Sequence, residues 1–344
     1  MNNKPEILLI YTGGTIGMVK DFKTGALKAF DFDKLLERIP ELYLLDCGIS
    51  TLSFDQPIDS SDMNLEHWLQ MAKTIEENYE NYDGFVILHG SDTMSYTASA
   101  LSFMLKNLAK PVILTGSQLP IGDLRTDAKE NLITAVQIAS LQEDNRPVIT
   151  EVCLYFEYKL YRGNRTTKIS AEHFNAFTSP NIPHLAESGV HLKINHDLLF
   201  KHNFVERFYV HQQLNPNVCV LKIFPGISQE VLENILNMTN LEGIVLETYG
   251  AGNAPTKGWF IQALKQAINR GVKIVNVTQC WGGSVDMNKY ENGLALREIG
   301  VVSGYDITTE SAITKMMVLL SEQMTHDEFA ARFQQPYCGE LTML

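Results

Sequence analysis

The 344-residue sequence has few of the features that mark export, membrane insertion or a metal framework. Its five cysteines are far apart and never form a Cys-x-x-Cys pair, which argues against a disulfide framework or a zinc site and favours free thiols in a reducing compartment. No stretch approaches the roughly 20 apolar residues that span a bilayer, so we expect no membrane segment. The first apolar run, Ile7–Tyr11, is too short for a signal-peptide core, and we expect a cytoplasmic protein.

Positive charge is also scarce. Lys and Arg number 28 against 40 Asp and Glu, which gives a formal net charge of −12. An acidic surface repels phosphate backbones, so we expect no nucleic-acid partner. The nine histidines are scattered without a His-Glu-x-x-His motif, so no metal site is predicted. Matches to Gly-x-Gly-x-x-Gly, to a P-loop and to the Gly-x-Ser-x-Gly elbow of serine hydrolases are lacking too.

What is present is an alternation of strand and helix patterns. Three apolar runs of the first half each end in a Gly-rich turn: Ile7–Tyr11, Gly84–Leu88 and Pro111–Leu114. Apolar residues recur at three- and four-residue steps over three segments, namely 64–79, 96–108 and 127–141. Continuous apolar strands between such helices are typical of βαβ units and predict a parallel sheet covered on both faces.

The second half predicts a smaller α/β domain after an irregular stretch. Residues from about 178 to 216 contain three prolines and little periodicity, and they predict an extended connector, with room for a strand or hairpin. Alternation then resumes with predicted strands at 218–224, 243–248 and 273–278. Helices are predicted near 228–238, 309–322 and 326–334, and another passes through Gln262 and Ile268 and stops at Gly271. This order predicts a second βαβαβ unit.

Candidate chemistry gathers where the strands of the first half end. Ligands of open α/β sheets bind beyond the carboxyl ends of the strands, at the point where the strand order reverses. Six hydroxyl residues could therefore converge on one crevice: Thr12, Thr15, Ser91, Thr93, Thr115 and Ser117. The alternative for each is a plain role as a turn former or helix cap. His89, which follows a buried strand, is predicted to be a hydrogen-bonded wall residue.

A threonine nucleophile is the remaining reaction type, and it needs a base. A hydroxyl is a weak nucleophile until an adjacent group takes its proton. Lys168 is one candidate, because it ends the run Tyr161–Lys168, in which basic and hydroxyl residues flank a Gly-Asn turn. Asp92 could orient it. The residues alone leave open the ordinary alternative, a solvated surface lysine.

The combination of motifs resembles the asparaginase/glutaminase family along essentially the whole chain. Three blocks carry most of the resemblance: Thr12-Gly13-Gly14-Thr15-Ile16-Gly17, His89-Gly90-Ser91-Asp92-Thr93-Met94 and Tyr161 to Lys168. Further blocks match in order at 59–63, 115–118, 250–255 and 279–280. Since no export signal is evident, the chain is similar to the type I, cytosolic branch rather than to the periplasmic type II enzymes.

The resemblance implies a hydrolase of side-chain amides that uses neither metal nor organic cofactor. Thr15 would attack the amide carbon of L-asparagine and form a β-aspartyl ester, which water would then release as L-aspartate. Ser91, Asp92 and Lys168 would activate the attacking group. Backbone N–H groups near Ser91 and in the Thr115-Gly116 turn would stabilise the oxyanion. The implied substrate-binding residues are Asp59, Ser60, Ser61, Ser91, Asp92 and Asn253.

Three departures from the family pattern stand out. Ser91 replaces the threonine of many members. The lid segment 19–30 lacks the tyrosine that many bacterial members carry, since Ala26 falls near its place. Some type I relatives use a tyrosine from the second domain instead, and Tyr290 is its best match. Tyr290 lies beside Asn292-Gly293, a pair that predicts a turn in a loop. Members with an allosteric asparagine site have an arginine where this chain has Glu247, although Thr167 and Cys280 match.

The fold implied by the resemblance has two α/β domains. Residues 1–190 are expected to form a doubly wound, flavodoxin-like catalytic domain, 191–215 a connector, and 216–344 a smaller Rossmann-like domain. Asn253 and Tyr290 would act at the site of a neighbouring copy, which implies a homodimer or a tetramer built from two dimers. The alternatives are a non-catalytic amino-acid sensor on the same scaffold, a glutaminase-leaning amidohydrolase, and the amide-hydrolysing subunit of a transamidase.

Overall fold

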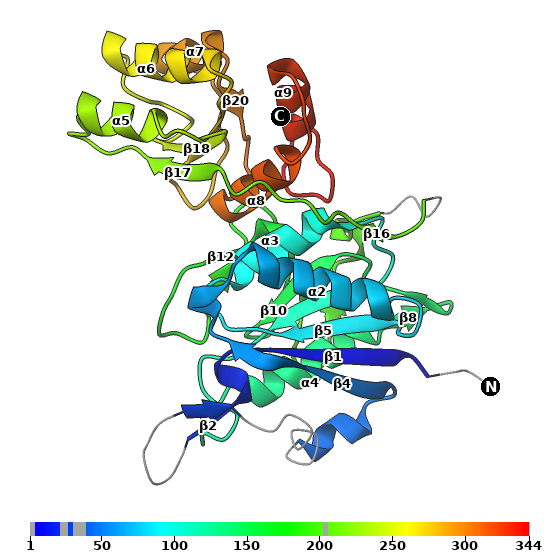
Figure 1. The fold of residues 1–344 in the computed structure, drawn as a ribbon. Coiled ribbons are helices and arrows are strands. Elements are labelled where there is room, and N and C mark those ends of the chain that lie inside the picture. The colour runs from blue at the N-terminus through cyan, green and yellow to red at the C-terminus, as the bar shows by residue number, and fades with distance from the viewer. Residues whose placement is uncertain (1–3, 21–26, 30–38, 202–205, 344) are drawn as a thin grey trace. The chain divides into compact units, whose positions relative to one another are not determined.

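The computed structural model describes residues 4–20, 27–29, 39–201 and 206–343. The chain divides into two compact units, Met1–His211 and Gln212–Leu344, which are coloured along the chain in Figure 1. Most of the predicted lid, including Phe22 and Ala26, lies outside the described residues. No helix among the described residues is long and apolar enough to cross a membrane, and all five cysteines are free thiols.

The first unit contains an eight-stranded sheet with the order β15-β14-β11-β10-β7-β5-β1-β4. Five neighbouring strands are parallel: β4 (Gly48–Ile58), β1 (Glu6–Gly13), β5 (Gly84–Leu88), β7 (Val112–Thr115) and β10 (Val152–Phe156). An antiparallel extension follows at one side: β11 (Lys159–Arg162), β14 (Ala186–Glu187) and β15 (Lys193–Ile194). The hairpin β14–β15 thus lies within the stretch that the sequence predicts to be irregular.

Helices cover both faces of this sheet, as the sequence predicts. Figure 1 shows α2 (Leu65–Asn78) and α3 (Met94–Met104) on one side and α4 (Ala128–Ala139) on the other. The side chain of Asn64 starts α2 by accepting hydrogen bonds from two backbone N–H groups of the first turn. The buried face of α2 carries Trp68, Met71, Ala72 and Ile75, which is the three- and four-residue spacing seen in the sequence.

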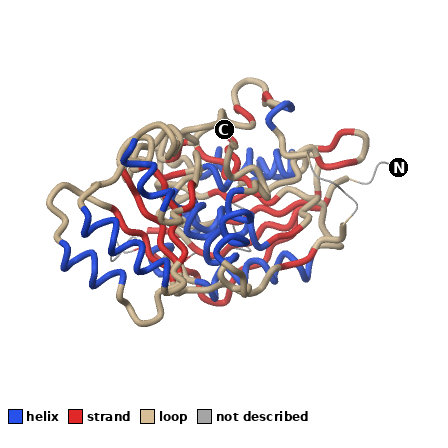
Figure 2. The backbone as a smooth tube through the Cα atoms, turned by 90° about the horizontal axis from the view of Figure 1, so that it is seen from above, coloured by secondary structure: helices blue, strands red, loops and turns tan. Residues whose placement is uncertain are grey.

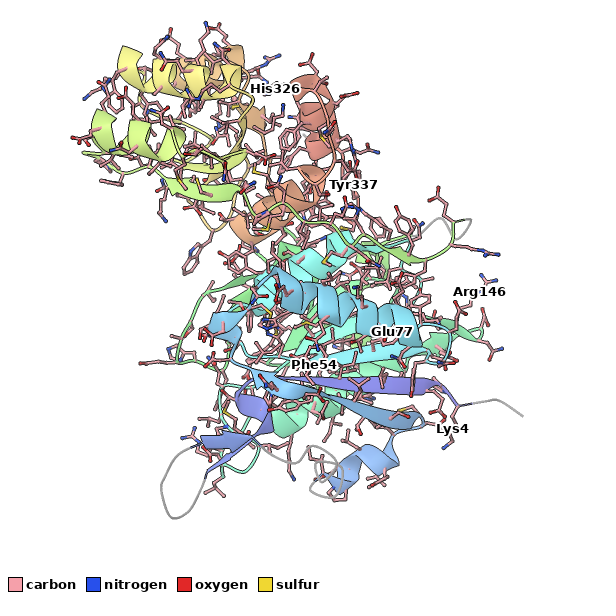
Figure 3. All side chains as sticks on the ribbon, viewed as in Figure 1. Lys4, Phe54, Glu77, Arg146, His326 and Tyr337 are labelled. Atoms are coloured by element: carbon pink, nitrogen blue, oxygen red, sulfur yellow. The ribbon has the colours of Figure 1, made fainter. Side chains whose placement is uncertain are left out.

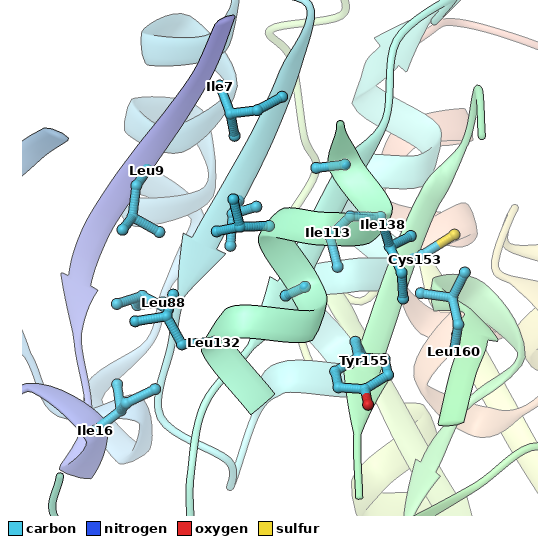
Figure 4. Close-up of a cluster of buried hydrophobic side chains, with 14 of the residues drawn as sticks. Ile7, Leu9, Ile16, Leu88, Ile113, Leu132, Ile138, Cys153, Tyr155 and Leu160 are labelled. Carbon is cyan, nitrogen blue, oxygen red and sulfur yellow. The ribbon is translucent and has the colours of Figure 1, made fainter. Parts of the chain in front are cut away.

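The core beneath α4 explains why these strands are apolar throughout. Figure 4 shows side chains of β1, β5, β7 and α4 packed together, among them Ile7, Leu9, Leu88, Ile113 and Leu132, all fully buried. Because helices lie on both sides, each central strand has no polar face. At about 25 cal/mol per Å² of buried apolar surface, such side chains contribute roughly 1.5–3 kcal/mol each.

Short ladders and turns complete the first unit. The two-stranded ladders are β2 (Met18–Lys20) with β3 (Leu27–Ala29), β6 (Leu105–Lys106) with β16 (Tyr209–Val210), β8 (Gln142–Glu143) with β9 (Arg146–Pro147), and β12 (Thr167–Lys168) with β13 (Phe177–Thr178). The 3-10 turns are η1 (Thr15–Gly17), η3 (Pro40–Leu44), η4 (Ser60–Asp62), η5 (Gly163–Arg165) and η6 (His196–Leu198). Figure 2 shows in tan the connections that carry these turns.

The second unit is a four-stranded parallel sheet with the order β17-β18-β19-β20. Its strands are β17 (Val218–Lys222), β18 (Gly243–Thr248), β19 (Lys273–Thr278) and β20 (Val302–Ser303). Its helices are α5 (Gln229–Leu236), α6 (Gly258–Asn269), α7 (Glu291–Glu298), α8 (Thr309–Leu319) and α9 (His326–Gln334). The predicted Ser228 cap is confirmed, because its hydroxyl accepts the backbone N–H of Val231.

One local prediction in the second unit is wrong. The Asn292-Gly293 pair predicts a turn in a loop, yet both residues lie in the first turn of α7, and Tyr290 is the residue that precedes the helix. The backbone carbonyl of Tyr290 accepts the N–H groups of Gly293 and Leu294, which starts the helix. Gly293 is needed for close packing, because a Cβ there would lie 2.8 Å from the Met287 carbonyl oxygen.

A buried ion pair fastens the C-terminal segment of the second unit. Both Lys315 and Glu340 have fully buried side chains, and the ammonium pairs with the carboxylate. Lys315 also donates to the carbonyls of Phe333 and Gln335, each at 2.7 Å. Burial alone would raise the pKa of Glu340, but Lys315 and backbone N–H donors outweigh it, so the pKa lies below its usual value.

Candidate active site

The first sheet reverses its strand order next to β1. Counted in chain order, its parallel strands are arranged 2-1-3-4-5, the flavodoxin-like order, with β1 between β4 and β5. The connections from β1 therefore lead to opposite faces of the sheet and leave a crevice at its carboxyl edge. Gly13, Ile58 and Leu88 end the three strands at this edge, directly before Thr15, Asp59 and Ser91 in the chain. This is the edge where the sequence places its candidate residues.

Two glycines let the three strand-end loops touch one another. Gly14 has φ 86°, and a Cβ added there would lie 2.5 Å from the backbone nitrogen of Gly90. A Cβ on Gly90 would in turn lie 2.4 Å from the Ser60 hydroxyl oxygen. The loops after β1 and β5 are therefore in direct backbone contact, and the side chain of Ser60 from the loop after β4 packs against Gly90. The structure thereby brings together the segments that carry Thr15, Ser91 and Ser60.

Lys168 meets the β5 loop from a segment 76 residues further along the chain. Its Nζ lies 2.6 Å from Asp92 Oδ1 and 2.9 Å from the Ser91 hydroxyl oxygen. The lysine side chain is 17% exposed, whereas that of Asp92 is 65% exposed. The alternative of a freely solvated lysine is therefore wrong. The short strand β12, paired with β13, holds Lys168 in place.

Thr15 begins the 3-10 turn η1 and is half-buried. Gly17 closes the turn, since its backbone N–H donates to the carbonyl of Gly14 at 3.3 Å. Among the described residues, no hydrogen-bond partner is found for the Thr15 hydroxyl. A hydroxyl without such a partner remains available to a substrate.

Asp59, Ser60 and Ser61 lie together after β4. The Asp59 carboxylate accepts the backbone N–H and the hydroxyl of Ser61, both at 2.9 Å. These two donors lower the pKa of Asp59, so the group stays ionised and suits an ammonium ligand. Ser60 is buried, and its carbonyl accepts the Thr93 hydroxyl at 2.7 Å. That bond ties the β4 loop to the start of α3.

Four of the six candidate hydroxyls bind backbone carbonyls instead of facing a ligand. Thr12 donates to Leu88 at 2.8 Å, Thr115 to Tyr155 at 2.9 Å, Thr93 to Ser60 and Ser117 to Leu119 at 2.6 Å. The turn role expected as the alternative fits Ser117, whose partner lies two residues away. Thr12 and Thr115 instead tie neighbouring strands together, and Thr93 ties two loops without a side-chain cap bond for α3. Ser91 is engaged with Lys168, so Thr15 and Ser91 remain as the hydroxyls suited to chemistry.

His89 is a fully buried wall residue, as predicted. Its Nδ1 lies 2.6 Å from the Gly90 carbonyl oxygen and its Nε2 lies 2.9 Å from the Thr97 hydroxyl. A carbonyl can only accept, so Nδ1 carries the proton and Nε2 accepts from Thr97. Burial lowers the pKa of His89 to about 4, and the ring is neutral at pH 7.

Gln118 is a residue of this edge to which the sequence assigns no role. The Ser91 hydroxyl donates to its Oε1 at 3.2 Å, and its Nε2 donates to the His173 carbonyl at 3.0 Å. Gln118 follows β7, and only the folded arrangement of β5 beside β7 brings it to Ser91. Two signals in the sequence could have pointed to it: its position after a strand end that contains a glycine, and its place in the block 115–118 that matches the family.

Asn253 and Tyr290 belong to the second unit. Asn253 is half-buried in the loop after β18, where its backbone forms an isolated bridge with Tyr249. Tyr290 is 49% exposed. At the position that differs from the allosteric members, Glu247 lies 3.5 Å from Lys222 Nζ and accepts the Thr309 hydroxyl at 2.7 Å.

A groove of about 630 Å³ lies in the second unit between β20 and α9. Its lining includes Asp286, Arg297, Tyr305 and His326, the last of which Figure 3 labels. None of the predicted site residues lines it. Within the described parts of the chain, no group of three or more His, Cys, Asp or Glu residues could hold a metal ion.

Comparison with known proteins agrees with this geometry. The family model "Asparaginase, N-terminal" matches residues 6–200, and the "Glutaminase/Asparaginase C-terminal domain" model matches residues 217–333. The chain is 43% identical to L-asparaginase 1 of Escherichia coli strain K12 over 340 residues, which cover 98% of both proteins.

Solved structures give the same result. L-asparaginase I from Vibrio cholerae superposes with a TM-score of 0.89 at 41% identity, covering 99% of this chain and all of that one. A probable cytoplasmic L-asparaginase from Campylobacter jejuni superposes with a TM-score of 0.80 at 26% identity, covering 96% and 99%. With both halves matched in order and the conserved fold in place, the chain belongs to the asparaginase/glutaminase family of amidohydrolases.

Proposed function

We propose that the protein hydrolyses the side-chain amide of L-asparagine to L-aspartate and ammonia, with Thr15 as the nucleophile. The observation that carries this proposal is the contact of Lys168 with Ser91 and Asp92 beside the turn of Thr15. A hydroxyl, a base and an acid in hydrogen-bond reach are what nucleophilic catalysis by a threonine requires.

In the first half-reaction, Thr15 Oγ attacks the amide carbon of asparagine. The Oγ–C bond forms while the Oγ–H proton leaves, and backbone N–H groups near Ser91 and of the Thr115-Gly116 turn stabilise the oxyanion. The C–N bond then breaks, the amide nitrogen takes up a proton, and ammonia departs. The product is a β-aspartyl ester on Thr15.

In the second half-reaction, water attacks the ester carbon. The water loses one proton as its oxygen bonds to the carbon, and Thr15 Oγ leaves and regains a proton. The released product is L-aspartate. We assign the proton transfers to Ser91 and Lys168, with Asp92 holding the lysine, because their distances of 2.9 and 2.6 Å support a proton relay.

The substrate's charged ends are assigned to the neighbouring loop. The ionised Asp59, together with Asp92, would bind the α-ammonium group, and the hydroxyls of Ser60 and Ser61 would bind the α-carboxylate. The lowered pKa of Asp59 supports its part, since a carboxylate binds an ammonium only when ionised.

We further propose that the protein works in the cytoplasm as a homodimer or a tetramer. Asn253 and Tyr290 of one copy would complete the site of a neighbouring copy, with the Tyr290 hydroxyl polarising Thr15. Sedimentation should then show no active monomer. A fully active monomer would exclude this assignment.

One assay decides between the enzyme and its alternatives. Ammonia release is measured side by side from L-asparagine and L-glutamine, together with binding of both by calorimetry. We expect turnover of asparagine above that of glutamine. Binding without ammonia release would favour the amino-acid sensor, and faster glutamine turnover would favour a glutaminase.

Lys168→Met tests the roles within the site. Because the residue is assigned to proton transfer, kcat should fall by about 10²- to 10⁴-fold while KM changes less. An unchanged kcat with a raised KM would contradict the assigned role. Asp92→Ala should weaken both binding and chemistry.

A further inference from the structure

Gln118 occupies a position next to Ser91 that the proposed reaction does not yet use. Its side chain spans two segments, accepting from the Ser91 hydroxyl at 3.2 Å and donating to the His173 carbonyl at 3.0 Å. Its own backbone N–H is held by both Asp127 carboxylate oxygens at 3.1 and 3.0 Å. Asp127 stands at the start of α4 but makes no side-chain cap bond there.

The His173 carbonyl fixes which end of the amide faces Ser91. A carbonyl oxygen accepts hydrogen bonds and cannot donate, so the NH₂ group of Gln118 must point toward it. The amide oxygen is then left facing Ser91 and can only accept. The Asp127 contact holds the backbone of Gln118 in place, while the His173 contact orients its amide.

This orientation determines where the Ser91 proton lies. While Lys168 is an ammonium, it donates to the Ser91 oxygen, so the hydroxyl hydrogen must point elsewhere. The Gln118 oxygen is the acceptor for it. We infer that Gln118 is a positioning residue for the proposed amide hydrolysis, which keeps the Ser91 proton in place while Lys168 is charged and yields it when Lys168 is neutral.

The proton count closes without another reactant. When Thr15 or water attacks, its O–H bond breaks and the proton moves to the Ser91 oxygen. The original Ser91 proton passes at the same time to the neutral Lys168 nitrogen, which becomes an ammonium. Ser91 ends as a hydroxyl whose new hydrogen again points to Gln118. The Lys168 ammonium then returns one proton through Ser91, to the departing amide nitrogen in the first half-reaction and to Thr15 Oγ in the second, so Lys168 is neutral before each attack.

Gln118→Met tests the inference, because it keeps the length of the side chain and removes the amide. This inference rests on the proposed function, so ammonia release by the unmodified protein is measured first. We expect kcat to fall about 10- to 100-fold, as for loss of one proton-relay contact, with KM within about threefold.

A double-mutant cycle with Ser91→Ala then separates positioning from general support of the fold. If Gln118 acts through Ser91, Gln118→Met should lower the residual kcat of Ser91→Ala by less than about threefold. The matched control is Thr126→Ala, which removes the hydroxyl contacts to the Leu119 carbonyl and to the Ala128 N–H and does not touch Ser91. Its effect should be the same with and without Ser91.

Gln118→Glu gives a readout that a purely structural role would not move. A carboxylate beside Ser91 favours the ammonium form of Lys168, so the pH at which kcat/KM rises should move upward by about 0.5 to 1 unit. Two results would overturn the inference. One is a decrease in kcat by Gln118→Met that is as large in the Ser91→Ala variant as in the unmodified protein. The other is a pH profile of kcat/KM that Gln118→Glu does not change. An unmodified protein that releases no ammonia would instead overturn the proposed function.

Discussion

The two largest sheets among the described residues both contain neighbouring parallel strands, yet only the first reverses its strand order. In the first unit β1 lies between β4 and β5, whereas in the second unit the order β17-β18-β19-β20 simply follows the chain. In open α/β sheets a crevice opens where successive connections lead to opposite faces, and the first sheet has such a point whereas the four-stranded sheet does not. The strand-end loops of the second sheet instead bear exposed aromatic residues, Phe224 at 53% and Trp281 at 68% exposure.

The comparison shows that two α/β units of one chain differ in what their polar residues do. In the first unit, the strand ends carry Thr15, Ser91 and Asp59, and the contacts between their loops are tight enough to exclude a Cβ. In the second unit, the firmest polar feature is the buried Lys315–Glu340 pair, which fastens the end of the chain. The first unit thus carries most of the proposed catalytic residues, whereas the buried ion pair of the second unit holds the end of the chain in place. Four predictions test this difference.

The largest expected effect is on the chemistry of the first unit. Thr15→Ala removes the proposed nucleophile and should lower kcat by about 10³-fold or more, because the proposed covalent intermediate cannot form. Steady-state ammonia release measures it. The control is an unchanged thermal unfolding curve, since Thr15 has no hydrogen-bond partner among the described residues. Turnover near that of the unmodified protein would rule out Thr15 as the nucleophile.

The second expected effect is on the stability of the second unit. Lys315→Met leaves the Glu340 carboxylate buried without its partner and should lower the free energy of unfolding by about 3–5 kcal/mol. Adding Glu340→Leu to the same variant should restore most of the loss, because no charge then remains buried. Urea unfolding followed by Trp259 and Trp281, both in this unit, measures the change. Equal stability of the single and double variants would show that the pair is not the cause.

The third prediction distinguishes the units by their response to acid. His89 has a pKa of about 4 when folded and about 6.5 when unfolded, so the unfolded chain binds more protons between these values. The first unit should therefore lose stability as the pH falls from 6.5 to 4, by about 3 kcal/mol in full. Glu340 has a lowered pKa, so its contribution is present above the ordinary value of 4.5 and is lost only further into acid.

Trp68 can report on this acid response separately. Its indole N–H donates to the Thr97 hydroxyl at 3.0 Å, and Thr97 is the partner of His89. A protein with Trp259→Phe and Trp281→Phe would retain Trp68 as its single tryptophan. Urea unfolding at pH 7 and pH 4.5 should show the loss, and His89→Gln should remove its pH dependence. An equal loss of stability between pH 7 and pH 4.5 with and without His89→Gln would show that groups other than His89 cause the acid response.

The smallest expected effect concerns what the second unit adds to the chemistry. Tyr290→Phe removes only a hydroxyl and should lower kcat by roughly 10- to 1000-fold if that hydroxyl polarises Thr15 of a neighbouring copy. Steady-state kinetics at saturating asparagine measure it. A kcat within about twofold of that of the unmodified protein would show that the Tyr290 hydroxyl does not take part in the reaction.

Much of the fold follows from the sequence, because its main elements are strongly periodic and buried. The apolar runs before the Gly-rich turns become β1, β5 and β7, and the predicted helices become α2, α3 and α4. The strand β4 is not evident in the sequence, since it is an edge strand, largely solvent-accessible, and includes a glycine and a proline. Helix α7 is misread because Asn-Gly favours turns locally, whereas here Gly293 is required by its contact with Met287.

The site is predicted less completely, and for a different reason. The sequence orders its candidate loops along the chain, but it does not say which hydroxyls are already bonded. Thr12 and Thr115 are bound to carbonyls of neighbouring strands, and Gln118 reaches Ser91 only through the pairing of β5 with β7. Such partners are set by tertiary contacts, which local pattern cannot contain.

The contact of Gly14 with Gly90 also has a consequence for how activity arises during folding. The loops that meet at this point lie in three separate stretches of the chain, and Lys168 must arrive from a fourth. Such non-local contacts form slowly, because the chain must lose the entropy of closing a large loop before the contact stabilises it. If Lys168 acts as proposed, a chain emerging from the ribosome contains Thr15 early but becomes active only after β12 has formed. Refolding experiments should accordingly find ammonia release among the last properties to return.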